Sequence, residues 1–250
     1  MSNASERPVL GDVTLVAVTS VAMSATIDAI RASIGQAEFG QILLLSNERP
    51  ADLDDVITWR PIKRLASRAD YSRFMLRDLA GHIQTSHALC IQWDGYVLNG
   101  RAWQPAFLDY DYIGAPWPHF CDLNVGNGGF SLRSRRLLAA CTALPLDGKD
   151  PEDIVISRLC RRQLEAQGIR FAPESLARQF SYERMVPTGE EFGFHGAFNL
   201  VRHLSTGDAE RIFRSLEPRI LARSERWELL RWALSRGRLS LASNMLGRII

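Results

Sequence analysis

Apolar runs and amphipathic stretches alternate along the first 95 residues of the chain. Four apolar runs of strand length are present, at residues 13–20, 41–47, 54–62 and 87–94. Between them, residues 23–35 and 68–83 place apolar side chains at helical spacing, and Gly35 is suited to end the first of these helices. Alternating strands and helices predict an α/β domain built on a parallel sheet.

The alternation breaks after residue 95. The pattern there predicts short strands within 109–117, 124–134 and 169–173, helices over 134–144 and 151–168, an aromatic loop over 186–199, and three short amphipathic helices from Thr206 onward. We therefore expect a mixed, Rossmann-like sheet flanked by helices over residues 9–204, followed by a helical extension over residues 205–250.

Composition excludes several classes of protein. The 250 residues are 46% hydrophobic, enough for one large core, and the net charge of +2 gives no case for nucleic-acid binding. The four cysteines form no C-x-x-C pair, the first residues lack the pattern of a signal peptide, and no window of about 18 apolar residues occurs. These features favour a cytoplasmic protein.

Polar residues follow the apolar strands where a parallel sheet binds its ligands. Thr19 and Ser20 end the first strand, Asn47 ends the second, and Gln92 and Asp94 end the fourth. Ligands of open α/β sheets lie at the carboxyl ends of the strands. No G-x-G-x-x-G and no P-loop follows the first strand, which argues against a dinucleotide dehydrogenase or a P-loop NTPase.

The strand that ends in Gln92-Trp93-Asp94 is similar to the D-x-D strand of GT-A fold nucleotide-sugar glycosyltransferases. The resemblance implies that Asp94 binds Mn²⁺ or Mg²⁺ and that the metal bridges the diphosphate of a nucleotide sugar, for which a UDP-sugar is our guess. Gln92 stands where the family has its first Asp. One carboxylate can suffice, because hard cations often take few protein ligands plus substrate phosphates, and Gln92 could bind the ribose.

Two further stretches extend the resemblance toward the donor and acceptor. "YSRF" (71–74) resembles a segment that lies beside the nucleotide in beta-galactosyltransferases, which makes Arg73 a candidate nucleotide contact. "VGNGGFSLRSR" (125–135) resembles their acceptor-side segment, where Gly128 and Gly129 would let the backbone approach a ligand closely.

The last two matching stretches supply titratable groups. In "PEDIVISR" (151–158), Glu152 and Asp153 stand where those enzymes keep an acidic cluster with the catalytic base. "FGFHG" (192–196) puts His195 where GT-A enzymes often keep a late metal-ligating histidine. With "DYIGAPW" (111–117), these stretches also resemble a bacterial family of unassigned function, often found with polysaccharide genes, over residues 10 to 200.

The resemblance implies a metal-dependent glycosyltransferase, inverting if Asp153 is the base that deprotonates the acceptor hydroxyl. The metal, held by Asp94 and His195, would assist departure of the nucleoside diphosphate. The acceptor would be a glycan or a lipid-linked sugar in bacterial surface polysaccharide assembly. From Arg202 onward the chain has ten Arg and five Asp or Glu, a balance of +5. These basic helices could cap the domain or dock peripherally on the inner face of a membrane.

Each candidate also has a plainer interpretation. Asp94-Gly95 is a common turn sequence, and acids at the start of a helix favour its dipole, which would explain Glu152 and Asp153. His195 could pack among phenylalanines. A solvated charge face would explain Arg73 with Arg77. The rival pair Asp109 and Asp111 is better explained as a turn or surface feature, and Trp93 and Trp103 as core residues rather than platforms for a sugar.

Two other functions stay open. Gln92 would suit a module that binds a sugar nucleotide or glycan without turnover. A sugar nucleotidyltransferase usually carries a Gly-rich, basic loop after its first strand, and "TSVAMSATID" (19–28) has no Gly, Lys or Arg.

Overall fold

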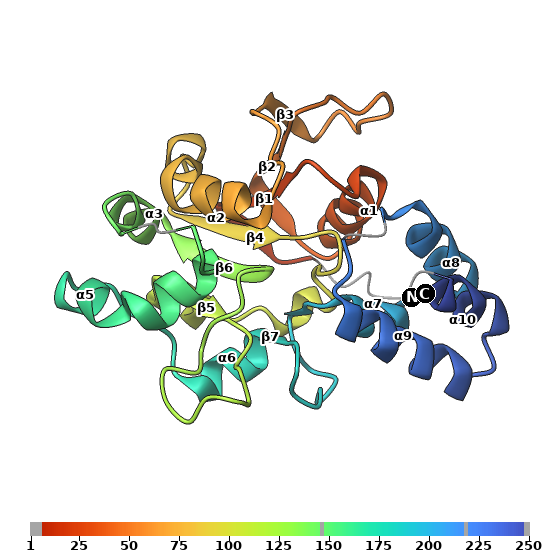
Figure 1. Ribbon diagram of the computed structural model, residues 1–250. Coiled ribbons are helices and arrows are strands. Elements are labelled where there is room, and N and C mark those ends of the chain that lie inside the picture. Colours follow the sequence, from red (N-terminus) through yellow and green to blue (C-terminus); the bar gives the residue numbers. More distant parts are fainter. Residues whose placement is uncertain (1–6, 146–147, 218–219, 248–250) are drawn as a thin grey trace, which may run out of the picture.

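A mixed six-stranded sheet forms the centre of the molecule (Figure 1). The computed structural model describes residues 7–145, 148–217 and 220–247. The sheet has the strand order β3-β2-β1-β4-β6-β5. Its strands are β1 (Val9–Thr19), β2 (Glu38–Ser46), β3 (Thr58–Pro61), β4 (His87–Ile91), β5 (Tyr112–Gly114) and β6 (Phe130–Ser134). The first four run parallel, whereas β6 is antiparallel to both β4 and β5.

Helices cover both faces of this sheet, so the expected Rossmann-like α/β architecture is present at that level. They are α1 (Met23–Ile34), α2 (Arg68–Arg77), α3 (Arg135–Cys141), α4 (Glu152–Ile154), α5 (Arg161–Ala166), α6 (Glu174–Phe180), α7 (Ala197–His203), α8 (Thr206–Ser215), α9 (Arg223–Ser235) and α10 (Leu239–Leu246). A π-helical turn, Val155–Leu159, joins α4 to α5.

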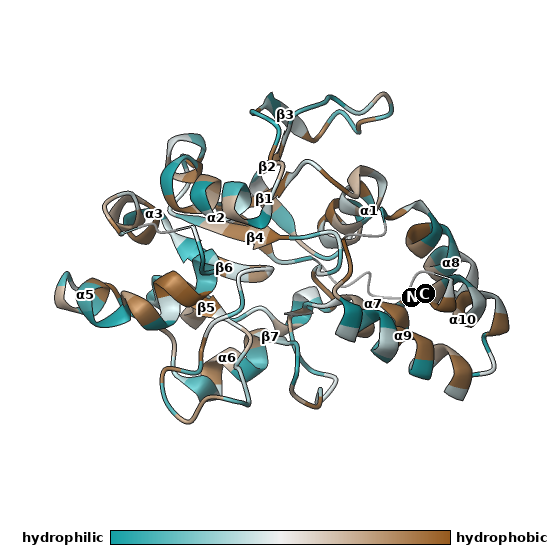
Figure 2. Ribbon diagram, in the orientation of Figure 1, coloured by the Kyte–Doolittle hydropathy of each residue, from teal (hydrophilic) through white to brown (hydrophobic). Residues whose placement is uncertain are grey.

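Strand periodicity explains the two faces. Leu15 and Ala17 of β1 share one buried cluster with Ile30 of α1 and Phe180 of α6. The alternate residues of β1 and β4 pack on the other face against α2 and α3. β4 is buried along its whole length and brown along most of it in Figure 2, as a strand covered on both faces must be.

The first two helices begin and end where local chemistry directs. Gly35 follows the last residue of α1, as expected. The Ser67 side chain accepts the backbone N–H of Asp70, and the Asp70 carboxylate in turn accepts the N–H of Ala66, which satisfies two donors at the start of α2.

One expected strand is absent. Residues 169–173 make only a single isolated parallel bridge, between Phe171 and Tyr112. Pro173 lies directly before α6, so the extended segment ends after a few residues. The expected helix over 151–168 is likewise interrupted by the π-helical turn.

The described residues after 205 form three helices, α8, α9 and α10, as the pattern predicted. Residues of α8, α9 and α10, among them Phe213, Leu229 and Leu241, share an apolar cluster with Val201 of α7, and Trp93 of the main domain packs against it. The helical extension therefore lies against the segment that follows β4. None of the described helices has the length and apolar character needed to cross a bilayer.

A second, two-stranded sheet lies late in the chain, and the residues after it contact the segment that follows β4. β7 (Ser181–Tyr182) pairs in parallel with β8 (Gly193–Phe194). The backbone N–H of Gly196 donates to the carbonyl of Asp94 at 3.0 Å. This contact ties the residues after β8 to the segment after β4.

Candidate active site at the carboxyl edge of the sheet

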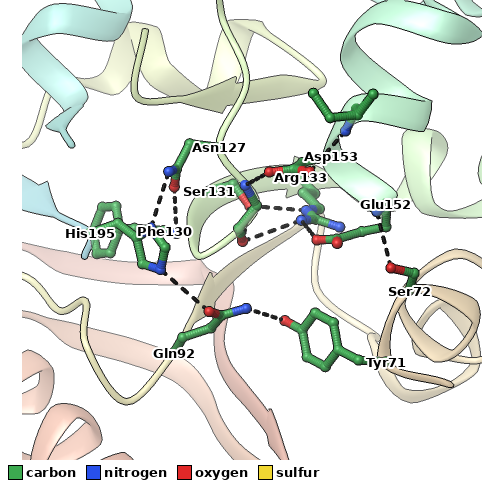
Figure 3. A network of polar contacts seen from close by, with 12 residues as sticks. Tyr71, Ser72, Gln92, Asn127, Phe130, Ser131, Arg133, Glu152, Asp153 and His195 are labelled. Carbon is green, nitrogen blue, oxygen red and sulfur yellow. Dashed lines mark hydrogen bonds and ion pairs between the residues drawn. The ribbon is translucent and has the colours of Figure 1, made fainter. Parts of the chain in front are cut away.

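The end of β4 and the start of β6 meet at one edge of the sheet. Ile91 of β4 is paired with Phe130 of β6, so Gln92 follows the pair on one strand and Gly129 precedes it on the other. Because β6 runs antiparallel, the loop before it joins the same edge as the carboxyl ends of the parallel strands. Figure 3 shows the polar groups of this edge on either side of that loop.

His195 lies at the centre of the first group. Its Nε2 atom is 3.3 Å from Oδ1 of Asp94 and 3.3 Å from Oε1 of Gln92. The Gln92 amide nitrogen donates to the Tyr71 hydroxyl at 3.0 Å, which fixes the amide so that its oxygen faces the imidazole. Asp94 and His195, which were expected to hold the metal, and Gln92, which was expected to bind the nucleotide, are therefore brought together.

The other ring nitrogen of His195 also has polar neighbours. Nδ1 is 3.4 Å from Oε1 of Glu183 and 3.1 Å from Nδ2 of Asn127. Burial opposes the charged imidazolium, but the carboxylates of Asp94 and Glu183 outweigh it and hold the pKa of His195 well above its ordinary value. Burial also opposes ionisation of Glu183, but the hydrogen bond with His195 and the positive charges of His195 and Arg184 together outweigh it and lower the pKa of that carboxyl.

The donor atoms on the Nε2 side fit a divalent cation. Oδ1 of Asp94 is buried and makes no hydrogen bond of ordinary geometry to the described residues. Metal–ligand distances of about 2.1–2.4 Å place adjacent ligands about 3.0–3.4 Å apart, and His195 Nε2 stands at that separation from Oδ1 of Asp94 and from Oε1 of Gln92. In the described part of the chain no cluster of three His, Cys, Asp or Glu side chains is arranged around a metal position. Two such ligands, the Gln92 amide and substrate oxygens would have to share the coordination.

The sequence matches a protein family described as "Protein of unknown function (DUF5672)" over residues 57–195, which is more than half of the chain. The chain belongs to the DUF5672 family. The match begins at the residue before β3 and ends at His195, so it contains Gln92, Asp94 and Glu183. No curated protein matches the chain.

A second polar group of this DUF5672 protein lies on the other side of the glycine loop (Figure 3). Arg133 of β6 is completely buried, and its guanidinium donates to Oε1 of Glu152 at 2.9 Å and to the carbonyl of Gly128 at 3.3 Å. The backbone N–H of Glu152 donates to the Ser72 hydroxyl. Glu152 is therefore turned into the protein and held there, unlike a residue that meets substrate.

Asp153 lies next to this pair but is only half-buried. Its carboxylate accepts the N–H of Gly128 at 2.9 Å, which places it on the loop that carries Gly129. Burial, and after it the charge of Glu152, raise the pKa of Asp153 to about 6. Of the two acids expected to act in catalysis, Asp153 is the more exposed one and has a raised pKa.

The two expected glycines do allow close approach, but of side chains of the protein itself. A Cβ on Gly129 would stand 2.0 Å from Nε2 of His195, and one on Gly128 would stand 2.2 Å from Oε1 of Glu152. The glycine pair therefore sets how near His195 and Glu152 come to the start of β6.

Four other expected residues lie apart from His195. The Thr19 hydroxyl is used in a turn with Val21. Ser20 accepts the N–H of Leu65, the Asn47 amide donates to Glu48, and Arg73 is exposed and paired with Asp70 at 3.3 Å. From the segment 71–74 it is Tyr71 and Ser72 that reach the site, because the helical turn directs Arg73 to solvent.

A shallow groove of about 390 Å³ opens beyond the ends of β1 and β2. Its lining comes from α1 (Met23, Ser24, Ile27 and Arg31) and from the loop after β2 (Pro50, Ala51 and Asp52). Ser20 and Asn47 stand just before these two lining segments in the chain.

Of the rival D-x-D pair, Asp111 stabilises the fold and Asp109 is exposed. Asp111 is buried and accepts hydrogen bonds from Ser134, Arg136 and the N–H of Arg170. The two candidate tryptophans pack on aromatic rings of the protein. Trp93 packs on Phe213 and Trp103 packs on Phe107.

Sequence reasoning missed Glu183, Asn127 and Tyr71. Tyr71 and Asn127 lie inside the stretches "YSRF" and "VGNGGFSLRSR" but were not singled out there, and Glu183 lies in no matching stretch. Each reaches His195 or Gln92 only through the tertiary fold. It also missed Glu225 at the start of α9: burial, and the negative charge of Asp94, raise the pKa of Glu225. The helical extension therefore adds to the electrostatics of the site.

Proposed function

We propose that this DUF5672 protein is a metal-dependent glycosyltransferase of the GT-A type that uses a nucleotide-sugar donor, with Mn²⁺ or Mg²⁺ as cofactor. The observation that carries the proposal is that Oδ1 of Asp94 and Oε1 of Gln92 each lie 3.3 Å from Nε2 of His195. Their place at the carboxyl edge of a mixed sheet, where open α/β folds bind ligands, supports it.

The position of each residue suggests its role in the reaction. Asp94 and His195 would hold the cation, with the Gln92 oxygen beside them. When bound, the cation supplies Lewis-acid charge to the departing diphosphate. The groove beyond β1 and β2 offers room for the nucleoside. Asp153 takes the proton of the acceptor hydroxyl, which makes the transfer inverting, and Arg133 and Glu152 fix the loop on which Asp153 rests.

Release of nucleoside diphosphate from a panel of nucleotide sugars, with Mn²⁺ present, tests this function. Asp94→Asn is expected to lower the rate about 100-fold or more, since the charge stabilisation at stake is several kcal/mol and each 1.4 kcal/mol is a factor of ten. Asp109→Asn is the matched control, because Asp109 is exposed in the rival D-x-D. Equal rates in the wild type and Asp94→Asn would refute the metal role of Asp94.

A binding module without turnover is the second candidate. It is favoured by Gln92, whose amide is already engaged with Tyr71 and His195. Calorimetry would decide for it if a nucleotide sugar bound with the same affinity with and without Mn²⁺ and was neither hydrolysed nor transferred.

We further propose a glycan or lipid-linked acceptor at an anionic membrane surface of the cytoplasmic side. Trp227, Arg231 and Leu234 are exposed at i, i+4 and i+7 on α9, and Leu239 and Leu246 are exposed on α10. After Glu228 the chain has four Arg and no acid. Co-sedimentation with phosphatidylglycerol vesicles but not with phosphatidylcholine vesicles is expected, and equal recovery with both would refute the electrostatic docking.

A further inference from the structure

Glu183 and His195 are held side by side by the small second sheet. Glu183 follows β7 and His195 follows β8, and the N–H of His195 donates to the carbonyl of Tyr182 at 3.0 Å. The buried amide of Asn199 donates to the carbonyls of both Glu183 and His195, at 2.7 and 2.8 Å. Because both backbones are clamped, the 3.4 Å between Glu183 Oε1 and His195 Nδ1 is built into the fold.

Asn127 competes with Glu183 for the same ring nitrogen. Its Oδ1 accepts the N–H of Phe130 at 3.3 Å, so its amide nitrogen faces His195 Nδ1 at 3.1 Å (Figure 3). A protonated Nδ1 would donate to Glu183, whereas an unprotonated Nδ1 would accept from Asn127. A neutral imidazole carries one proton, so these two arrangements exclude each other.

The two arrangements leave opposite states at Nε2. With the proton on Nδ1, Nε2 presents a lone pair toward Asp94 and Gln92. With the proton on Nε2, the ring donates to Asp94 or Gln92 and has no lone pair to offer there. Only the first arrangement leaves His195 able to ligate a cation beside Asp94.

We propose that Glu183 is a positioning residue that keeps the proton of His195 on Nδ1 and thereby directs the Nε2 lone pair to the cation site. An ionised carboxylate accepts a hydrogen bond more strongly than an amide donates one to a neutral nitrogen. The inference rests on the proposed function, in that it assigns His195 as a ligand. Outer partners of this kind orient metal-bound histidines in proteins, and their removal typically costs 10–100-fold in metal affinity.

The test compares Glu183→Gln with Glu190→Gln in the full-length protein. Glu190 lies on the same loop but is exposed, so the control makes the same change away from the ring. The first readout is the ¹⁵N shift of the His195 ring nitrogens, recorded without metal at a pH where the ring is neutral and assigned with His195→Gln. The second is Mn²⁺ affinity from electron paramagnetic resonance of free Mn²⁺, with thermal unfolding as the check on folding.

We expect the wild type and Glu190→Gln to carry the proton on Nδ1, and Glu183→Gln to carry it on Nε2 because Asn127 then prevails. Mn²⁺ affinity of Glu183→Gln should fall about 10–100-fold. An Nδ1 proton in Glu183→Gln with Mn²⁺ affinity within about twofold of the control would overturn the inference. Should Asp94→Asn bind Mn²⁺ as well as the wild type does, the metal role fails instead, while the ring signal still reports on Glu183.

Discussion

Two buried charged groups flank the Gly128–Gly129 loop. They differ in exposure and in the kind of atom that lacks a hydrogen bond within the part of the chain that the structure describes, a donor (Nη1 of Arg133) in one and an acceptor (Oδ1 of Asp94) in the other. The Arg133–Glu152 pair is sealed, with side chains 0% and 5% exposed, and its charges meet each other at 2.9 Å. Around His195 the side chains of His195 and Asp94 are 15% and 8% exposed, and Oδ1 of Asp94 makes no ordinary hydrogen bond to the described residues. A sealed pair holds a loop in place, whereas a group with an unused acceptor near solvent is suited to receive a ligand.

Breaking the sealed pair should have the largest effect on stability. Arg133→Met leaves the Glu152 carboxylate buried without its partner, and we expect a loss of about 3–5 kcal/mol in the free energy of unfolding. Denaturant titration measures it, with exposed Arg73→Met expected to change stability by no more than about 0.5 kcal/mol.

Replacing both Arg133 and Glu152 tests whether the loss of stability comes from the carboxylate that is left buried alone. Arg133→Met with Glu152→Leu should recover part of the loss, because no charge then stays buried alone. A single Arg133→Met variant that unfolds at the wild-type midpoint would show that the pair does not stabilise the loop.

Gly129→Ala should lower Mn²⁺ affinity at the His195 group more than it lowers the stability of the fold. The added methyl would meet Nε2 of His195 at 2.0 Å and push the ring from Asp94. We expect a loss of about 1–3 kcal/mol in stability and Mn²⁺ affinity lowered at least about tenfold, measured by denaturant titration and paramagnetic resonance. Gly81→Ala is the control, since a Cβ there meets no atom within 4 Å, and wild-type Mn²⁺ affinity in Gly129→Ala would contradict the packing argument.

The pH dependence of the transfer rate should be the mildest effect. It reports on Asp153, which lies next to Glu152 and accepts the N–H of Gly128 in the loop between the two charged groups. A base with a pKa of about 6 must be ionised, so the transfer rate should rise with pH and reach half its maximum near pH 6. Initial rates between pH 5 and 8 measure this. Asp153→Asn should be inactive throughout, and a wild-type rate that is flat across pH 6 would remove Asp153 as the base.

Stability should move the opposite way in the same window. Because the pKa of Asp153 is raised in the folded protein, its protonated form favours folding, and that contribution is lost as pH rises from the ordinary carboxyl range through about 6. Asp153→Asn should remove this part of the pH dependence of unfolding.

The sequence carries much of the sheet and part of the site. Apolar runs locate β1, β2 and β4, since buried parallel strands leave few alternatives, and the place of Asp94 follows from them, although β4 ends at Ile91, three residues earlier than expected. The short extended segment around Phe171 was wrongly expected to be a strand, because a single bridge and a strand look alike in five residues. His195 lies 3.3 Å from Asp94, a separation that a shared metal site would require, while the metal itself stays a prediction.

Neither the apolar pattern nor the resemblance could identify the residues that support His195 and Gln92. Glu183 sits in "SYERM", which has no pattern of its own, and reaches His195 only because two strands of two residues each pair in one register. Arg73 was favoured over Tyr71 on the resemblance alone, whereas the phase of α2 turns Tyr71 inward and Arg73 outward.

The distance along the chain between the two halves of the site has a kinetic consequence. Gln92 and His195 are separated by 103 residues, while β4 and β6 pair over a much shorter span. Loop closure costs more entropy over longer spans, so we expect the sheet to form first and the segment 181–203 to dock last. A ligand that joins Asp94 to His195 would then act as a reversible cross-link on the last segment to fold, and slower hydrogen exchange at the β8 amides would report its binding.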